Sequence, residues 1–199
     1  MDDKGIEFSL FSWGGEDKIL KDAHLNFMVY SKEVVITGEV PTQAIRNYVV
    51  KQAPLKDFKI KKVYNEIKVA KNTGLLSRAK DSAITIESKA LFQNQDVFNP
   101  LHVEIMTENR TVYLMGALTN REANKVTKIV STIGGVERIV KFFHYLKTRP
   151  AAEIKRNKQR KLEAERKKKL EAERAVIERK KAELRRQIKA LNPKDGTSF

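Results

Sequence analysis

The chain has 199 residues, and its apolar fraction of 41% is enough for one medium or two small globular domains. Its 40 Lys and Arg exceed its 25 Asp and Glu by 15, and it contains no cysteine. The composition therefore excludes disulfides, thiolate metal sites and a cysteine nucleophile.

The positive charge is concentrated towards the C-terminal end. Residues 150–199 contain 17 Lys and Arg against 8 Asp and Glu, a net charge of +9, which leaves +6 for residues 1–149. No apolar run reaches the length of a membrane span, and residues 1–4 do not have the pattern of a signal peptide. Either the protein is cytoplasmic, or its targeting segment has been removed from this sequence.

An internal repeat occupies most of the chain. Residues 24–40 align without a gap with residues 102–118 at an offset of 78, and one residue is lost before Val63 pairs with Val140. The identical pairs at this offset include His24 and His102, Met28 and Met106, Val34 and Val112, Gly38 and Gly116, Asp3 and Asp81, and Ile6 and Ile84. A match of this length predicts a duplicated domain, and we call the two copies module 1 and module 2.

Each module is predicted to have the element order α-β-β-α-β. Module 1 begins with a helical segment that contains Trp13, which we expect to pack in the core or between the modules because aromatic residues at this spacing usually pack. Residues 25–29 and 34–36 alternate in polarity, which is the period of strands with one buried face. A helix from Thr42 and a strand over residues 59–69 complete the module.

Module 2 follows a linker of residues 71–80, which is so short that the two modules are expected to touch. A short helix is predicted over Ile84–Phe92. Strands over residues 102–106 and 111–115, again with one buried face, are joined by a tight turn at residues 108–110.

The second helix of module 2 has clear signals at both ends. Thr119 and Glu122 have the spacing of a capping box, and Gly134-Gly135 ends the segment where a left-handed residue is needed. The apolar stripe between them consists of Ala123, Val126, Ile129, Val130 and Ile133. A last strand follows over residues 136–146, and we expect Gly38 and Gly116, at the same strand end of each module, to have equivalent conformations.

The segment after Pro150 is rich in helix-forming residues up to Asn192-Pro193. Glu163 and Lys167 have the spacing of a favourable i,i+4 pair. The apolar residues that recur every seven positions are Leu170, Ile177, Leu184 and Leu191, a stripe too narrow for a confident coiled coil. Three interpretations stay open: a solvated helix, a helix that self-associates or docks on a partner, and an electrostatic contact with anionic lipid or nucleic acid.

Few residues are candidates for catalysis or metal binding. His24 and His102 share one position of the repeat, which points to a structural role, and neither they nor His144 have a second ligand at metal-binding spacing. The sequence has no Ser/His/Asp order, phosphate-binding loop or metal motif. We therefore expect a binding protein and not an enzyme, with no cofactor and no metal.

Three segments carry a resemblance to a known family. The V-x-L-x-G strand at residues 112–116, the helix that starts near Thr119 and the GGVERI sequence at residues 134–139 resemble the BON domain. The two copies together, over residues 2–147, are similar to the dual-BON proteins of the proteobacterial periplasm. The resemblance implies an α+β fold of two tandem BON repeats, each a small three-stranded mixed sheet with two helices, plus a long C-terminal helix. The expected boundaries are residues 2–70 and 81–147 for the domains, 71–80 for the linker and 148–199 for the charged tail.

The resemblance also implies a function and a site. Proteins of this kind are non-enzymatic, lie at the inner leaflet of the outer membrane, bind anionic phospholipids and support envelope integrity. In such proteins the lipid contact lies on the first helix of the second BON domain, so the matching lipid-binding residues here are Ile84, Thr85, Ile86 and Lys89. Ala83 occupies the position at which a member of the family has a tryptophan, so the aromatic ring that could anchor in the membrane interface is missing here.

The expected partner is therefore the surface of an anionic phospholipid membrane, and the expected location is the periplasm, in association with the outer membrane. Other envelope proteins are possible partners of the C-terminal helix. The alternative function is a protein–protein scaffold or assembly subunit that uses the BON modules and the helix. Nucleic acid is not expected as a partner, because acidic residues are interleaved through the basic tail and no aromatic platform accompanies them.

Overall fold

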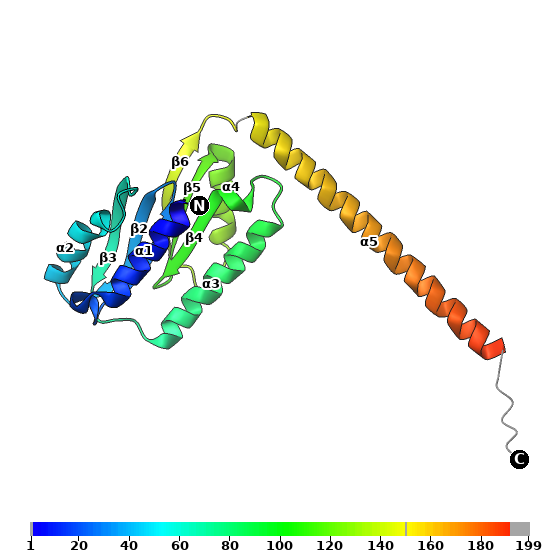
Figure 1. Cartoon of the computed structure of the whole chain (residues 1–199), viewed down its shortest axis with the longest axis horizontal. Helices are drawn as coiled ribbons and strands as arrows, with labels where there is room; N and C mark the ends of the chain where they lie inside the picture. Colours follow the sequence, from blue (N-terminus) through cyan, green and yellow to red (C-terminus); the bar gives the residue numbers. More distant parts are fainter. Residues whose placement is uncertain (1, 150, 192–199) are drawn as a thin grey trace, which may run out of the picture. The chain divides into compact units, whose positions relative to one another are not determined.

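The computed structural model describes residues 2–149 and 151–191. The chain divides into two compact units, Met1–Thr148 and Arg149–Phe199 (Figure 1). The first unit contains both modules, and the second contains the long helix predicted from the tail sequence.

The element order α-β-β-α-β occurs twice in the first unit, as predicted. Module 1 consists of α1 (Asp2–Glu16), η1 (Lys18–Leu20), β1 (His24–Tyr30), β2 (Glu33–Val40), α2 (Gln43–Gln52), η2 (Ala53–Leu55) and β3 (Lys62–Val69). Module 2 consists of α3 (Leu75–Gln93), η3 (Pro100–His102), β4 (Val103–Glu108), β5 (Thr111–Thr119), α4 (Asn120–Val130) and β6 (Arg138–Leu146). The predicted α+β fold class is confirmed.

Each module has a three-stranded mixed sheet with the second strand in the centre. In module 1, β2 pairs antiparallel with β1 and parallel with β3. In module 2, β5 pairs antiparallel with β4 and parallel with β6. The parallel pairs require a crossover, which α2 and α4 provide.

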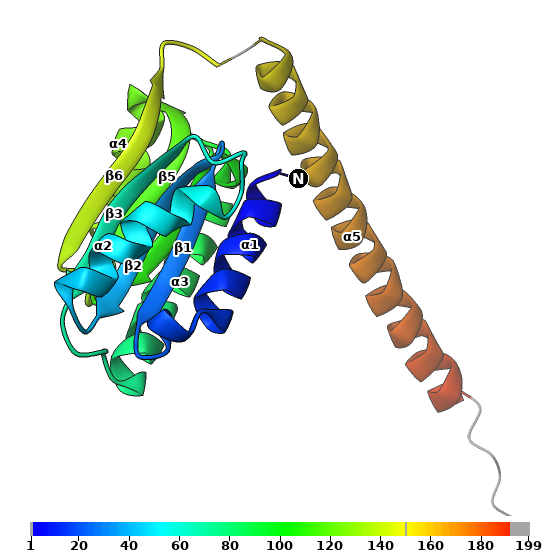
Figure 2. The same cartoon turned by 60° about the vertical axis from the view of Figure 1, so that its left-hand side comes forward.

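Both helices of a module cover the same face of its sheet. In module 1, Ile6 and Leu10 of α1 and Val49 of α2 share one buried cluster with Phe27 and Ile36, which are register partners in β1 and β2. Figure 2 shows α1 and α2 on the same side of this sheet. The equivalent cluster of module 2 joins α3 and α4 to the strands β4 and β5.

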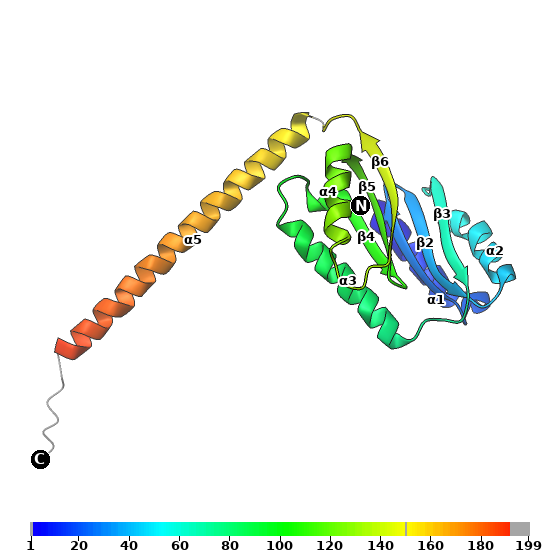
Figure 3. The ribbon, with the colours of Figure 1, turned by 180° about the vertical axis from the view of Figure 1, so that it is seen from behind.

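The other faces of the two sheets pack against each other. Met28 and Val35 of module 1 form a buried cluster with Tyr113 and Met115 of module 2. Figure 3 shows the strands in the middle of this unit, with α2 on one side and α3 and α4 on the other. The expectation that the modules touch is confirmed, but the expectation of one buried face per strand is wrong for β2 and β5. These central strands are buried almost throughout, because each lies between a helix layer and the other sheet.

A duplicated aspartate fixes the first hairpin of each module. The Asp3 carboxylate accepts hydrogen bonds from the backbone N–H groups of Ser31 and Lys32, at 2.7 and 2.8 Å. The Asp81 carboxylate accepts the corresponding bonds from Asn109 and Arg110, at 2.9 and 2.8 Å. All four turn residues have positive φ, so these carboxylates hold a backbone conformation that non-glycine residues seldom adopt.

The duplicated glycines share a role but not a conformation. A Cβ atom on Gly38 would lie 1.9 Å from the carbonyl oxygen of His24, and one on Gly116 would lie 2.3 Å from that of His102. Gly38 has a φ of +111°, whereas Gly116 is not among the glycines with positive φ. The prediction of equivalent conformations is therefore wrong, although both positions exclude a side chain for the same steric reason.

Local signals located some helix ends better than others. The capping box is present, with the Glu122 N–H donating to Thr119 Oγ1 at 3.4 Å and the Thr119 N–H donating to Glu122 Oε2 at 2.7 Å. The helix it starts ends at Val130, before Gly134, and only Gly135 has positive φ. Trp13 is buried in module 1, as expected. The helix predicted from Ile84 begins instead at Leu75, within the segment assigned to the linker.

The second unit contains α5 (Ala151–Leu191), a helix of 41 residues. At 1.5 Å per residue it is about 60 Å long. Its described side chains are exposed except for the half-buried Asn157. Lys167 lies 3.9 Å from Glu171, and not in a pair with the predicted Glu163. Among the described residues, no helix is long and apolar enough to cross a membrane.

Candidate functional site

The four predicted lipid-binding residues lie on different sides of α3. Ile84 is 5% exposed and belongs to the core of module 2, as its repeat partner Ile6 belongs to the core of module 1. Thr85 is half-buried and donates a hydrogen bond from Oγ1 to Thr107 Oγ1 at 2.8 Å. Ile86 is 69% exposed, and Lys89 is exposed on the next turn.

The structure therefore corrects the role of Ile84. Its side chain packs under α3 and cannot reach a partner while the module is folded. Residues two apart on a helix point in nearly opposite directions, at about 100° per residue, so Ile84 and Ile86 cannot serve the same surface. Only Ile86 and Lys89 are in a position to contact a partner at the outside of the helix.

Along α3, the side that faces away from the core is largely apolar. We call this surface the outer face of α3, and its exposed residues are Leu75, Leu76, Ala79, Ser82, Ala83, Ile86, Glu87, Lys89 and Ala90. Leu75 is 83% exposed and Ile86 69%, and the alanines between them add only small side chains. The surface is a shallow apolar stripe, with one acidic side chain, Glu87, and one basic side chain, Lys89, near Ile86.

A cleft of about 450 Å³ opens between the two modules beside α3. Module 1 contributes His24 and Asn26 of β1. Module 2 contributes residues of α3 and β4, namely Arg78, Asp81, Ser82, Thr85, Ile86, Ile105, Met106, Thr107 and Glu108. Ile86 therefore belongs to both the outer face of α3 and the lining of this cleft, whereas Thr85 belongs to the lining only.

Glu108 is the unusual group in the cleft, because its carboxylate is buried where the modules meet. Asn26 Nδ2 donates to Glu108 Oε2 at 2.6 Å, and His24 Nε2 lies 3.7 Å from the same oxygen. The other oxygen, Oε1, is buried without a hydrogen-bond partner. Burial raises the pKa of the Glu108 carboxyl to about 7, and the bond from Asn26 opposes this rise only in part.

The pKa of the neighbouring His24 imidazole is shifted in the opposite direction. Burial lowers the pKa of His24, and the nearby Arg78 guanidinium lowers it further. His24 is therefore neutral at neutral pH, so its contact with Glu108 is a polar contact and not an ion pair. The cleft holds a carboxyl group that changes charge near neutral pH, beside an imidazole whose pKa is below its ordinary value.

The sequence did not predict the role of Glu108. The turn pattern placed it in the tight turn at residues 108–110, whereas it is the last residue of β4 and is 6% exposed. Its partner Asn26 is 82 positions earlier in the chain, in the other module. No local pattern connects two such residues, and only the packing of the modules brings them together.

Glutamine at position 108 is expected to make the protein more stable above neutral pH. In the folded state the carboxyl has a raised pKa, so between its ordinary value of 4.5 and about 7 the folded protein binds more protons than the unfolded chain. The free energy of unfolding of the wild-type protein therefore falls as pH rises through this window. The pKa shift alone corresponds to about 3 kcal/mol, which solvent screening of the carboxyl reduces to about 2 kcal/mol. The Glu108→Gln variant lacks this loss and should melt about 5 °C higher at pH 8.

Thermal unfolding of both proteins at pH 5, 6, 7 and 8 measures this difference. The gap should be smallest at pH 5 and should widen steadily towards pH 8. Parallel pH profiles for the two proteins would show that Glu108 is ionised in the folded protein.

A metal site and the remaining histidine, His144, are the other candidates for chemistry in the parts of the chain that the structure covers. Among these residues, no group of three or more His, Cys, Asp or Glu side chains could hold a metal ion. His144 Nε2 lies 3.1 Å from Glu33 Oε2, so its contact joins β6 of module 2 to β2 of module 1. This contact accounts for the histidine as part of the inter-module interface.

Comparisons with known proteins agree with the duplicated architecture. The BON domain model matches residues 2–71 and 80–147. The chain is 28% identical over 147 residues to the outer membrane lipoprotein DolP of Haemophilus influenzae, covering 73% of this chain and 76% of DolP. It is 25% identical over 148 residues to the 21 kDa hemolysin of Actinobacillus pleuropneumoniae, covering 73% of this chain and 75% of the hemolysin.

Among solved structures, the C-terminal domain of CdsD, a structural protein of the type III secretion system of Chlamydia trachomatis, matches with 15% identity and a TM-score of 0.30. The match covers 73% of this chain and 68% of the CdsD chain. A likeness at this TM-score carries no information on function.

Proposed function

Because the chain belongs to the BON-domain family and carries two copies of the domain, we propose that it is a non-catalytic, outer-membrane-associated protein of the periplasm. In this proposal it binds anionic phospholipid and supports envelope integrity. The similarity to DolP, which is named as an outer membrane lipoprotein, supports the location. The net charge of +15 favours an anionic partner.

One observation carries the lipid-binding part of the proposal, namely the exposure of Ile86 in the middle of the outer face of α3. The Ile86 side chain is 69% exposed, and its transfer from water into an apolar environment lowers the free energy. Lys89 lies one turn away, where an ammonium group can meet a lipid phosphate. An apolar side chain with a cation beside it suits the boundary between headgroups and acyl chains.

A scaffold or assembly subunit is the second candidate function, and the exposed apolar residues of α5 favour it. Leu170, Ile177 and Leu184 recur every seven residues and are each 50–56% exposed. Such a stripe suits a partner helix. In this alternative, the helix contacts other envelope proteins and lipid is incidental.

The Ile86→Asp variant is expected to bind anionic vesicles about tenfold more weakly than the wild-type protein. The substitution removes the apolar contact and places a negative charge near lipid phosphates, and about 1.4 kcal/mol of lost binding free energy corresponds to a tenfold change. Co-sedimentation with phosphatidylcholine vesicles, with and without phosphatidylglycerol, measures the effect. Ile84 is left unchanged, because aspartate there would be buried in the core.

Leu101→Asp is the matched control, since Leu101 is also an exposed aliphatic residue of module 2, at 73%. Its binding should equal that of the wild-type protein. Equal binding by all three proteins would rule out the outer face of α3 as the lipid contact. Failure of the wild-type chain to bind anionic vesicles at low salt would remove the lipid function and favour the scaffold.

A further inference from the structure

Module 1 has an unusual connection between its second helix and its last strand. We call residues 51–62 the basic loop; they run from the end of α2 through η2 to the start of β3. The basic loop contains five lysines and a single acidic residue, Asp57, a net charge of +4 in 12 residues. Residues 1–70 as a whole contain 11 Lys and Arg against 10 Asp and Glu, so the charge of module 1 is concentrated in this loop.

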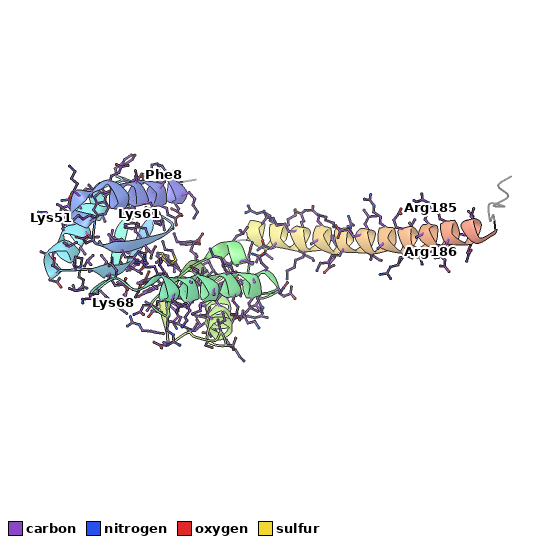
Figure 4. The ribbon with its side chains drawn as sticks, turned by 90° about the horizontal axis from the view of Figure 1, so that it is seen from below. Phe8, Lys51, Lys61, Lys68, Arg185 and Arg186 are labelled. Atoms are coloured by element: carbon purple, nitrogen blue, oxygen red, sulfur yellow. The ribbon has the colours of Figure 1, made fainter. Side chains whose placement is uncertain are left out.

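Two large apolar side chains of the same loop project into solvent. Phe58 is 92% exposed and Leu55 is 72% exposed, and neither belongs to the buried core of module 1. Phe8 of α1 is 75% exposed on the side of its helix opposite to the buried Ile6 and Leu10. Figure 4 shows Phe8 at the outer edge of module 1, with Lys51 and Lys61 on the same module.

The backbone around Phe58 is held in place. The Asp57 carboxylate accepts a hydrogen bond from the Lys59 N–H at 2.9 Å, and the Ile60 N–H donates to the Asp57 carbonyl at 3.1 Å. Ile60 packs against the core, and the Lys61 N–H donates to the Lys32 carbonyl at 2.8 Å. These hydrogen bonds hold the turn in place, and the Phe58 side chain on it is exposed to solvent.

Contacts with α1 place the basic loop beside that helix. Lys59 Nζ lies 3.8 Å from Asp2 Oδ1, at the start of α1. Lys56 Nζ lies 4.9 Å from the centre of the Trp13 ring, near the end of α1. Lys56 and Lys59 thus lie on the helix-covered side of module 1. Lys62 differs, because its Nζ lies 4.4 Å from the centre of the ring of Tyr64, which packs against the inter-module cluster.

Module 2 provides an internal control for these residues. With Val63 aligned to Val140, Phe58 corresponds to Gly135 and Leu55 corresponds to Thr132. The matching range of module 2, residues 128–139, contains no aromatic residue, but Lys128 and Arg138 stand opposite Lys51 and Lys61. The fold therefore needs neither the exposed ring nor a lysine at positions 56, 59 and 62, whereas a basic residue at positions 51 and 61 is common to both modules.

We propose that the basic loop is a second membrane contact, which docks on an anionic lipid surface by inserting Phe58 and Leu55 between headgroups whose phosphates the lysines bind. The proposal rests on the proposed lipid-binding function and adds to it a site in module 1. Transfer of exposed apolar side chains from water into the membrane interface lowers the free energy of binding. Each lysine near an anionic surface adds electrostatic attraction. A bilayer interface meets both requirements at once, because its anionic headgroups lie directly above hydrocarbon.

The asymmetry between the modules gives this site a physical role. In module 2 the matching surface has Ile86 but lacks an aromatic ring, because Ala83 occupies the position of the tryptophan in the similar family member. In module 1 the repeat position of Ile86 is Phe8, and the basic loop adds Phe58. The larger exposed rings lie in module 1, so this module offers the deeper insertion into a bilayer.

Vesicle binding by the full-length chain tests the proposal. The Leu55→Ser/Phe58→Ser variant should bind phosphatidylglycerol-containing vesicles about tenfold more weakly, and Lys51→Glu/Lys61→Glu should weaken binding by a similar factor at low salt. Leu101→Ser in module 2, with a side chain 73% exposed, is the matched control and should bind normally. Normal binding by the Leu55→Ser/Phe58→Ser variant would overturn the proposal.

A direct measurement of depth uses the absence of cysteine in the chain. Spin labels attached to Phe58→Cys, Ile86→Cys and Leu101→Cys report contact with lipid in the presence of the same vesicles. We expect the label at position 58 to enter the lipid and the label at position 101 to stay in water. A label at 86 in lipid with the label at 58 in water would overturn this inference alone, whereas no binding by the wild-type chain would overturn the proposed function as well.

Discussion

Replacement of Gly38 by alanine is expected to lower the melting temperature of the protein by about 10 °C. The new Cβ atom would lie 1.9 Å from the backbone oxygen of His24, so the register partners β1 and β2 would have to separate. The φ of +111° adds strain for any residue with a side chain. Together these effects cost at least about 3 kcal/mol of the free energy of unfolding.

Gly5→Ala is the control for the loss of a glycine. Gly5 lies inside α1, and no atom lies within 4 Å of the position of its added Cβ. Alanine is favoured over glycine in a helix by about 1 kcal/mol, so this variant should melt slightly above the wild-type protein. A Gly38→Ala protein that melts at the same temperature as wild type would show that β1 and β2 are farther apart at this position.

Deletion of residues 150–199 is expected to weaken binding to phosphatidylglycerol vesicles by about tenfold or more at low salt. The segment carries a net charge of +9, more than half of the total, and its described basic side chains are exposed along α5. Figure 4 shows Arg185 and Arg186 projecting from different sides of the helix, so the charge is spread around it. Because salt screens such charges, the truncated protein should also respond less to added salt.

A charge variant separates the effect of the tail charge from that of the tail itself. Lys167→Gln/Lys168→Gln/Lys169→Gln keeps good helix-forming residues and removes three positive charges. Its vesicle binding, measured by co-sedimentation at low and moderate salt, should lie between those of the full-length and truncated proteins. Equal binding by all three would make α5 a spacer or a partner-binding helix, and would favour the scaffold function.

The internal repeat made much of the fold predictable, and it also contained information on the site. Ile84 is identical to its repeat partner Ile6, whereas Ile86 differs from its repeat partner Phe8, and an apolar residue that is identical in both modules is more simply explained by a core than by a ligand. The structure buries both residues. The family resemblance selected a continuous run of residues on α3, and helical geometry then separates Ile84 from Ile86.

The basic loop shows where local patterns reach their limit. Its lysines are visible in the sequence, but Leu55 and Phe58 look like ordinary apolar residues that could pack in the core. Ile60, two residues after Phe58, does pack against the core. Which of these side chains faces solvent depends on the turn at Asp57, and only the folded backbone decides it.

The duplication, the order α-β-β-α-β in each module and the charged helix at the end of the chain were all predictable from the amino-acid sequence. These features follow from periodicity, capping residues and composition, which act over a few residues at a time. The packing of the two sheets against each other and the burial of Glu108 against Asn26 were not predictable and are seen only in the folded chain. Both features depend on contacts between residues of different modules, which are far apart in the chain. Side-chain packing between such residues leaves no periodic pattern in the sequence, so it could not be predicted from local patterns.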